Sequence, residues 1–84
     1  MDYTYKHIDS ATTTTVTTKD GGVLHSIVVN TKAAGAITVS DNAGTIAILK
    51  SDIAEGTFLY DVAYSGYLQV ITAHADSDIT ISYS

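Results

Sequence analysis

The acidic side chains are the residues of this sequence that could most readily bind a metal ion. The chain has nine Asp plus Glu residues among 84. Asp76 and Asp78 have the alternating spacing of calcium-loop ligands, but the glycine and distal glutamate of an EF-hand loop are missing. The dipeptide Asp41-Asn42 predicts a turn, because such side chains bond their own backbone. Turn formation is the favoured interpretation at both places, calcium binding is the alternative, and no metal is predicted.

Acid–base catalysis has one candidate pair, Asp52 and Glu55, in a long loop. A glycosidase needs two carboxylates that flank a cleft, and a chain of this size has little volume for one. The sequence also lacks a Gly-x-Ser-x-Gly turn and a glycine-rich phosphate loop. We therefore interpret the pair as solvated loop charges and expect neither an enzyme nor a cofactor.

Three histidines, His7, His25 and His74, are scattered without the spacing of metal ligands. His25 lies in the most apolar segment, where a histidine is expected to hydrogen-bond at a sheet face or to pack at an interface. A pH sensor at a subunit boundary is the alternative, since histidine titrates near neutral pH. His7 and His74 are predicted to be exposed.

Tyrosine is the over-represented aromatic residue: the chain has six Tyr, one Phe and no Trp. A tyrosine ring offers a large, stiff contact area with a polar tip. Tyr64 and Tyr67 flank Ser65-Gly66, which predicts a two-residue hairpin with the two rings close together. The rings then either pack across the hairpin or form a contact patch for a protein or glycan, and the lack of Trp weakens the glycan interpretation.

Composition excludes several classes of partner. The net charge is −5, with four Lys and no Arg. Nucleic-acid binding relies on Lys and Arg, so a nucleic-acid partner is not expected; anionic membranes are disfavoured for the same reason. No apolar run reaches the roughly 20 residues of a membrane span, and no signal peptide is predicted, so cytosolic synthesis is the default. Without Cys there are no disulfides to support a thin core, and self-association is therefore expected.

Thr, Val, Ile and Tyr dominate a series of short segments separated by Gly, Asn and Asp. This pattern predicts an all-β chain with about eight short strands in a single β-sandwich, jelly-roll-like, over residues 1–84. The predicted strands are residues 3–8, 12–18, 23–30, 36–40, 45–50, 57–64, 67–73 and 78–83. Only residues 51–55 could form a single helical turn.

Alternation along the predicted strands gives the expected core. In residues 23–30 it does not decide between two sets of inward positions, 24, 26 and 28 or 23, 27 and 29, because both faces are apolar. That strand is either central or covered by a neighbouring subunit. The later inward candidates are Ile37, Val39, Ile46, Ile48, Phe58, Tyr60, Val62, Leu68, Val70, Ile79 and Ile81.

The N-terminal residues 1–19 are the poorest in large aliphatic side chains and contain the run Thr12-Thr13-Thr14-Thr15. One interpretation is a solvated strand with Thr on both faces. The other is an extended or strand-exchanging arm that orders by adding a strand to another chain, since it lacks a strong side-chain register of its own.

Five segments carry a resemblance to a known group of proteins. They are GVLHSIVVN at 22–30, ITVSD at 37–41, LYDV at 59–62, GYLQVIT at 66–72 and DITISY at 78–83. Together they resemble small β-rich virion proteins of tailed bacteriophages, particularly capsid decoration (cement) proteins. The resemblance implies a protein that is made in the host bacterial cytoplasm, assembles on the capsid surface, often as a homotrimer, and reinforces the shell. Its partner would be the major capsid protein or another virion protein.

The expected contact residues are Tyr3, Tyr5, Thr13, Thr15, Tyr64 and Tyr67. Two alternatives remain. The first is a small receptor- or carbohydrate-binding β-sandwich module of a phage tail or fibre. The second is an adhesin- or pilin-like subunit that exchanges strands.

Overall fold

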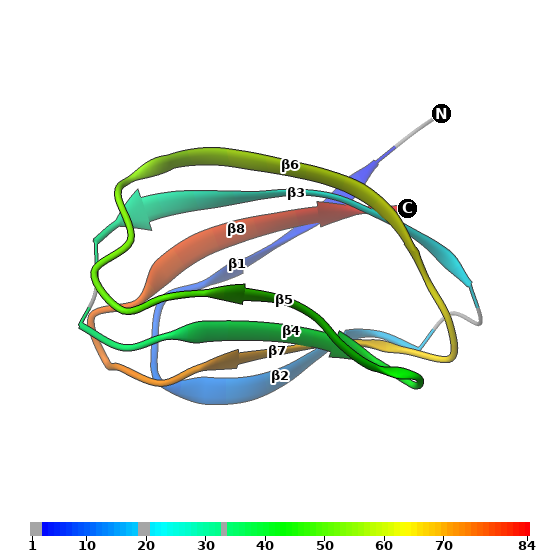
Figure 1. The fold of residues 1–84 in the computed structure, drawn as a ribbon, viewed down its shortest axis with the longest axis horizontal. Helices are drawn as coiled ribbons and strands as arrows, with labels where there is room; N and C mark the ends of the chain where they lie inside the picture. Colours follow the sequence, from blue (N-terminus) through cyan, green and yellow to red (C-terminus); the bar gives the residue numbers. More distant parts are fainter. Residues whose placement is uncertain (1–2, 19–20, 33) are drawn as a thin grey trace.

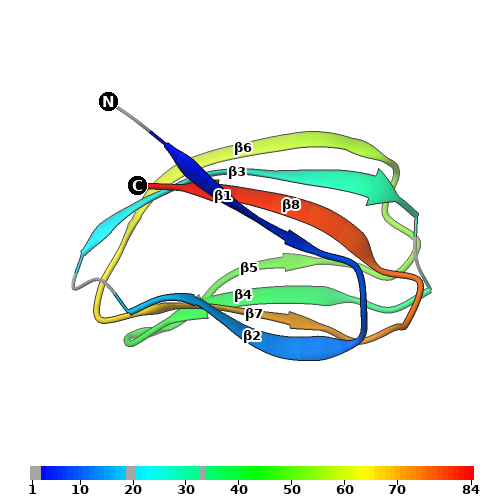
Figure 2. The same ribbon diagram turned by 180° about the vertical axis from the view of Figure 1, so that it is seen from behind.

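Two antiparallel four-stranded sheets face each other in the computed structural model, which describes residues 3–18, 21–32 and 34–84 (Figures 1 and 2). The described residues form eight strands and no helix, so the predicted all-β sandwich is confirmed. Every predicted strand end lies within one residue of the observed end. The strands are β1 (Thr4–Ile8), β2 (Thr12–Thr17), β3 (Gly22–Thr31), β4 (Ile37–Asp41), β5 (Gly44–Leu49), β6 (Gly56–Tyr64), β7 (Leu68–Thr72) and β8 (Asp78–Tyr83).

The strand order is that of a jelly roll. The first sheet has the order β1-β8-β3-β6, and the second has the order β2-β7-β4-β5. The antiparallel pairs β1/β8, β2/β7, β3/β6 and β4/β5 are those of one long hairpin, which is folded over so that successive pairs lie in opposite sheets. The pairs β8/β3 and β7/β4 then complete each sheet.

The predicted hairpin at Ser65-Gly66 is wrong. Strands β6 and β7 belong to different sheets, so the chain crosses from one sheet to the other at this corner (Figure 1). Gly66 has a φ of 77°, and the Asn42 N–H donates a hydrogen bond of 3.1 Å to the Ser65 carbonyl. A glycine turn shows where the chain changes direction, but not which strand the next segment will pair with.

The possible helical turn at residues 51–55 is also not helical. The chain turns there through Asp52, whose φ is 61°, and Ile53 donates a backbone hydrogen bond of 3.2 Å to Lys50. This segment links the edge strands β5 and β6 of the two sheets.

The core lies between the sheets and is aliphatic apart from Tyr64. Its apolar members are Ile8, Leu24, Ile27, Val29, Ile37, Val39, Ala47, Leu49, Tyr64, Leu68, Val70, Ile79 and Ile81. On β3 neither predicted phase holds throughout, because the register shifts between Leu24 and Ser26 against both neighbouring strands. Leu24 therefore points inward before this β-bulge, and Ile27 and Val29 point inward after it.

A second bulge overturns an expected core position. The register between β4 and β5 shifts after Val39, which pairs with Ala47 and leaves Ile46 as the extra residue. Ala47 and Leu49 consequently face the core, and Ile48, expected inside, is 65% exposed. Val62, also expected inside, is 39% exposed on the edge strand β6.

The N-terminal segment pairs within its own chain. Strand β1 is an edge of the first sheet beside β8, and β2 is an edge of the second sheet beside β7. Met1, Asp2 and Lys19 of the expected arm lie outside the described residues. Exchange of these strands with another chain stays a prediction.

Candidate contact surfaces

The outward side of the first sheet, called here the polar–aromatic face, is built from two rows of directly opposed residues. Residues opposite each other in antiparallel strands share a face. One row is Tyr5, Ser82, Ser26 and Leu59, and the next is His7, Thr80, Val28 and Thr57. Tyr5 is 70% exposed and Leu59 is 67% exposed, so two large side chains stand free on this face.

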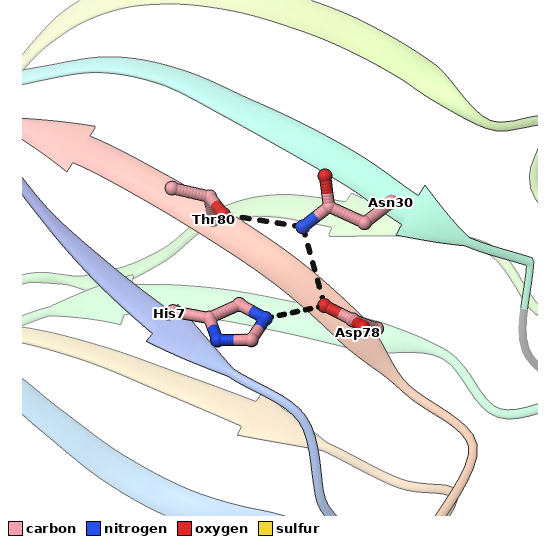
Figure 3. A network of polar contacts seen from close by, with 4 residues as sticks. All are labelled: His7, Asn30, Asp78 and Thr80. Carbon is pink, nitrogen blue, oxygen red and sulfur yellow. Dashed lines mark hydrogen bonds and ion pairs between the residues drawn. The ribbon is translucent and has the colours of Figure 1, made fainter.

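A polar network joins three strands of this face (Figure 3). His7 Nε2 and Asp78 Oδ1 lie 2.5 Å apart, with the ring N–H donating to the carboxylate. Asn30 Nδ2 donates to the same oxygen at 3.2 Å and to Thr80 Oγ1 at 3.1 Å. The hydrogen bond from His7, followed by that from Asn30, lowers the pKa of the Asp78 carboxyl group. The network therefore fixes the edge strand β1 to β8 and β3.

A second cluster lies at the bulge of β3. Tyr3 stacks on the His25 ring, with centroids 4.0 Å apart and planes at 14°. His25 Nδ1 lies 2.6 Å from Asp61 Oδ1, and Asp61 has a φ of 49° at the matching irregularity of β6. The expected hydrogen bond of His25 at the sheet face is thus confirmed. His7 is exposed as predicted, and His74 is half-buried.

The outward side of the second sheet, called here the uncharged face, differs in chemistry. Its two rows are Thr13, Ile71, Thr38 and Ile48, and Thr15, Gln69, Ser40 and Thr45. Among these described residues none is ionisable. Ile48 is 65% exposed and Ile71 is 38% exposed. This face is therefore a neutral surface with two exposed aliphatic side chains.

The ionisable residue in the strands of the second sheet is Asp41, and it is buried. Its Oδ1 accepts backbone hydrogen bonds from Ala43 at 2.9 Å and Gly44 at 3.1 Å, and its Oδ2 accepts one from Ser65 at 3.1 Å. The predicted turn role of Asp41 is confirmed. This carboxylate also fastens the β4–β5 turn to the β6–β7 corner.

Two of the other carboxylates considered for chemistry, Glu55 and Asp76, have different partners. Glu55 accepts a hydrogen bond of 3.1 Å from the Lys32 backbone N–H. Asp76 lies beside His74, with 3.6 Å between its Oδ2 and the ring Nδ1. Within the described residues there is neither a cluster of three or more such side chains able to hold a metal nor a detectable pocket.

The six predicted contact residues do not share one surface. Tyr3 and Tyr5 lie on or beside the polar–aromatic face, and Thr13 and Thr15 lie exposed on the uncharged face. Tyr64 is only 3% exposed and donates a hydrogen bond of 2.8 Å to the Ser84 carbonyl.

Burial raises the pKa of the Tyr64 hydroxyl, and Tyr67 is half-buried. The Tyr64 side chain is thus a core residue, because the corner turns it between the sheets. The strongly exposed Leu59 and Ile48 were not predicted as contacts. The exposure of Leu59 could be predicted from strand alternation, because Leu59 lies between the inward candidates Phe58 and Tyr60. The exposure of Ile48 could not, because no sequence signal marks the bulge at Ile46.

Comparison of the sequence with models of known protein families and with curated proteins gives no significant match. In the described part of the chain no helix is long and apolar enough to cross a membrane.

Proposed function

We propose that this chain is a non-enzymatic structural virion protein, a decoration protein that binds and stabilises the capsid of a tailed bacteriophage. The observation that carries the proposal is the jelly-roll strand order together with two chemically different outer faces. Jelly rolls are common in viral capsid proteins, so the topology supports the proposal by analogy. The sequence resemblance to small phage virion proteins supports it independently of the strand order.

In this proposal the polar–aromatic face contacts the capsid. Tyr5 and Leu59 offer exposed rings and aliphatic groups, and the surrounding His, Asp and Asn groups can hydrogen-bond at the rim. Such a mixture of aromatic anchors and polar neighbours is typical of protein–protein contacts. The partner is the major capsid protein or another virion protein, and a homotrimer that repeats on a lattice would multiply modest contacts.

Binding to particles tests the proposal. Purified protein is mixed with phage particles that lack it, and the bound fraction is measured after sedimentation. We expect saturable binding that falls at least tenfold in affinity for Tyr5→Ala, since an aromatic anchor buried on binding contributes roughly 2 kcal/mol or more. Lys50→Ala, an exposed change in the loop before β6, is the matched control. No binding to particles, or equal binding of the Tyr5 variant, would contradict this assignment of the face.

Carbohydrate binding on a phage tail or fibre is the second candidate, and one observation favours it. The exposed Tyr5 ring lies in the row next to the His7–Asp78 pair, and an aromatic ring beside a carboxylate suits a sugar. A glycan array distinguishes the two functions. Binding of a defined saccharide that disappears in Tyr5→Ala, without binding to capsids, would favour the carbohydrate-binding module.

A further inference from the structure

The charges of this molecule are distributed unequally between its two outer faces. Two carboxylates, Asp61 and Asp78, lie on the polar–aromatic face, each against a histidine. The uncharged face has none among its described residues, and the buried Asp41 beneath it is bonded to three backbone N–H groups. Electrostatic repulsion between two like molecules is therefore smallest at the uncharged face.

This difference matters because the whole chain carries a net charge of −5. A second copy that approaches the polar–aromatic face brings its own carboxylates toward Asp61 and Asp78. Like charges placed together across an interface are unfavourable. At the uncharged face the opposed groups are hydroxyls, an amide and aliphatic side chains, which can contact their own kind without a charge penalty.

The exposed aliphatic groups supply the attraction. Ile48 lies on β5, an edge of the second sheet, and shares a row with Ile71. No charged residue or proline lies in β5, although sheet edges are commonly protected by such residues. In contrast, the edge strands of the first sheet contain Lys6 and Asp61.

We propose that the uncharged face, with Ile48 at its exposed end, is the surface where a second copy of this chain binds. The inference rests on the proposed function in one respect, since it assigns a surface to the self-association expected there. It requires no particular number of subunits. The polar–aromatic face is then left free for the capsid.

The size of the face sets the expected strength. Four strands spaced about 4.8 Å apart and roughly 20 Å long give a footprint of about 400 Å². A stable interface buries about 800 Å² on each partner. The face alone thus provides about half of that area, so association in dilute solution should be weak and concentration-dependent, in a range that sedimentation can measure.

Sedimentation equilibrium over a wide concentration range tests the proposal, with a closely matched pair of variants. Ile48→Lys places a charge on the uncharged face, and Leu59→Lys places one on the edge strand of the other sheet at almost the same exposure, 67% against 65%. We expect Ile48→Lys to raise the dissociation constant at least tenfold and Leu59→Lys to leave it within about twofold. Circular dichroism and melting of dilute samples verify that both variants fold.

Ile71→Lys, in the same row, is a second variant should Ile48→Lys fail to fold, and it should weaken association in the same direction. The proposal is overturned if the unaltered protein stays monomeric at all concentrations. It is equally overturned if Leu59→Lys disrupts association while Ile48→Lys does not. If the protein is monomeric but still binds phage particles, only this inference is contradicted. If it forms an oligomer that does not bind them, only the proposed function is contradicted.

Discussion

Replacement of Asp41 should destabilise the fold more than replacement of any exposed carboxylate. This side chain is 9% exposed and accepts three backbone hydrogen bonds that join the β4–β5 turn to the corner after β6. A hydrogen bond to a charged group contributes roughly 1.5–3 kcal/mol. Because the freed N–H groups lie near the surface and can be partly rehydrated, the three contributions are not additive. We expect Asp41→Ala to lower the free energy of unfolding by about 3 kcal/mol.

Urea unfolding followed by circular dichroism, at a concentration where the protein is monomeric, measures this loss. For a domain of this length, 3 kcal/mol corresponds to a fall in Tm of roughly 12–24 °C. Asp41→Asn retains an acceptor for the Ala43 and Gly44 N–H groups but places an amide N–H near that of Ser65. Asp41→Asn should therefore lower the free energy of unfolding by only about half as much as Asp41→Ala.

Asp9→Ala is the control, because Asp9 is exposed in the loop between β1 and β2. This variant should stay within about 0.5 kcal/mol of the unaltered protein. The explanation fails if Asp41→Ala is as stable as Asp9→Ala, or if Asp41→Asn is the less stable of the two Asp41 variants.

Further variants examine the corner, the polar network and Tyr64. Gly66→Ala should lower the free energy of unfolding by about 2–4 kcal/mol, because φ is 77° and a Cβ would lie 2.7 Å from the Asn42 Cβ. In an Asn42→Gly background, which lacks that Cβ, urea unfolding should show that Gly66→Ala lowers it by only about 1 kcal/mol. The lowered pKa of Asp78 gives stability that is present above the ordinary carboxyl pKa of about 3.9 and is lost as the pH falls through the lowered value. The free energy of unfolding should therefore fall less between neutral and strongly acid pH for Asp78→Asn than for the unaltered protein. An equal fall in both proteins would contradict the network. Tyr64→Phe should cost about 1 kcal/mol and Tyr64→Ala about 3–5 kcal/mol in the same assay, whereas unchanged stability of Tyr64→Ala would contradict its place in the core.

The strand positions could be predicted from the sequence because the local signals are strong. Segments of Thr, Val and Ile end at Gly, Asn or Asp, and these residues set strand limits through their own backbone preferences. The pairing of distant strands has no such local signal. The Ser65-Gly66 turn fits a hairpin as well as a corner, and only the packing of β6 against β3 decides between them.

Bulges explain the errors in the predicted faces. One extra residue reverses the inward and outward positions after it. The bulge in β5 places Ile48 on the outside, as part of the uncharged face. The bulge in β3 lets both Leu24 and Ile27 point inward although they are three residues apart. The polar network was equally hidden, because His7 and Asp78 are 71 residues apart and meet only through the β1/β8 register.

The most direct test of the central claim is the copy number of this chain in phage virions purified by density gradient, measured by quantitative mass spectrometry. A capsid decoration protein should be present in numbers of the same order as the major capsid protein. A handful of copies per virion would place the chain on the tail or a fibre. Complete absence from virions would contradict the proposed function.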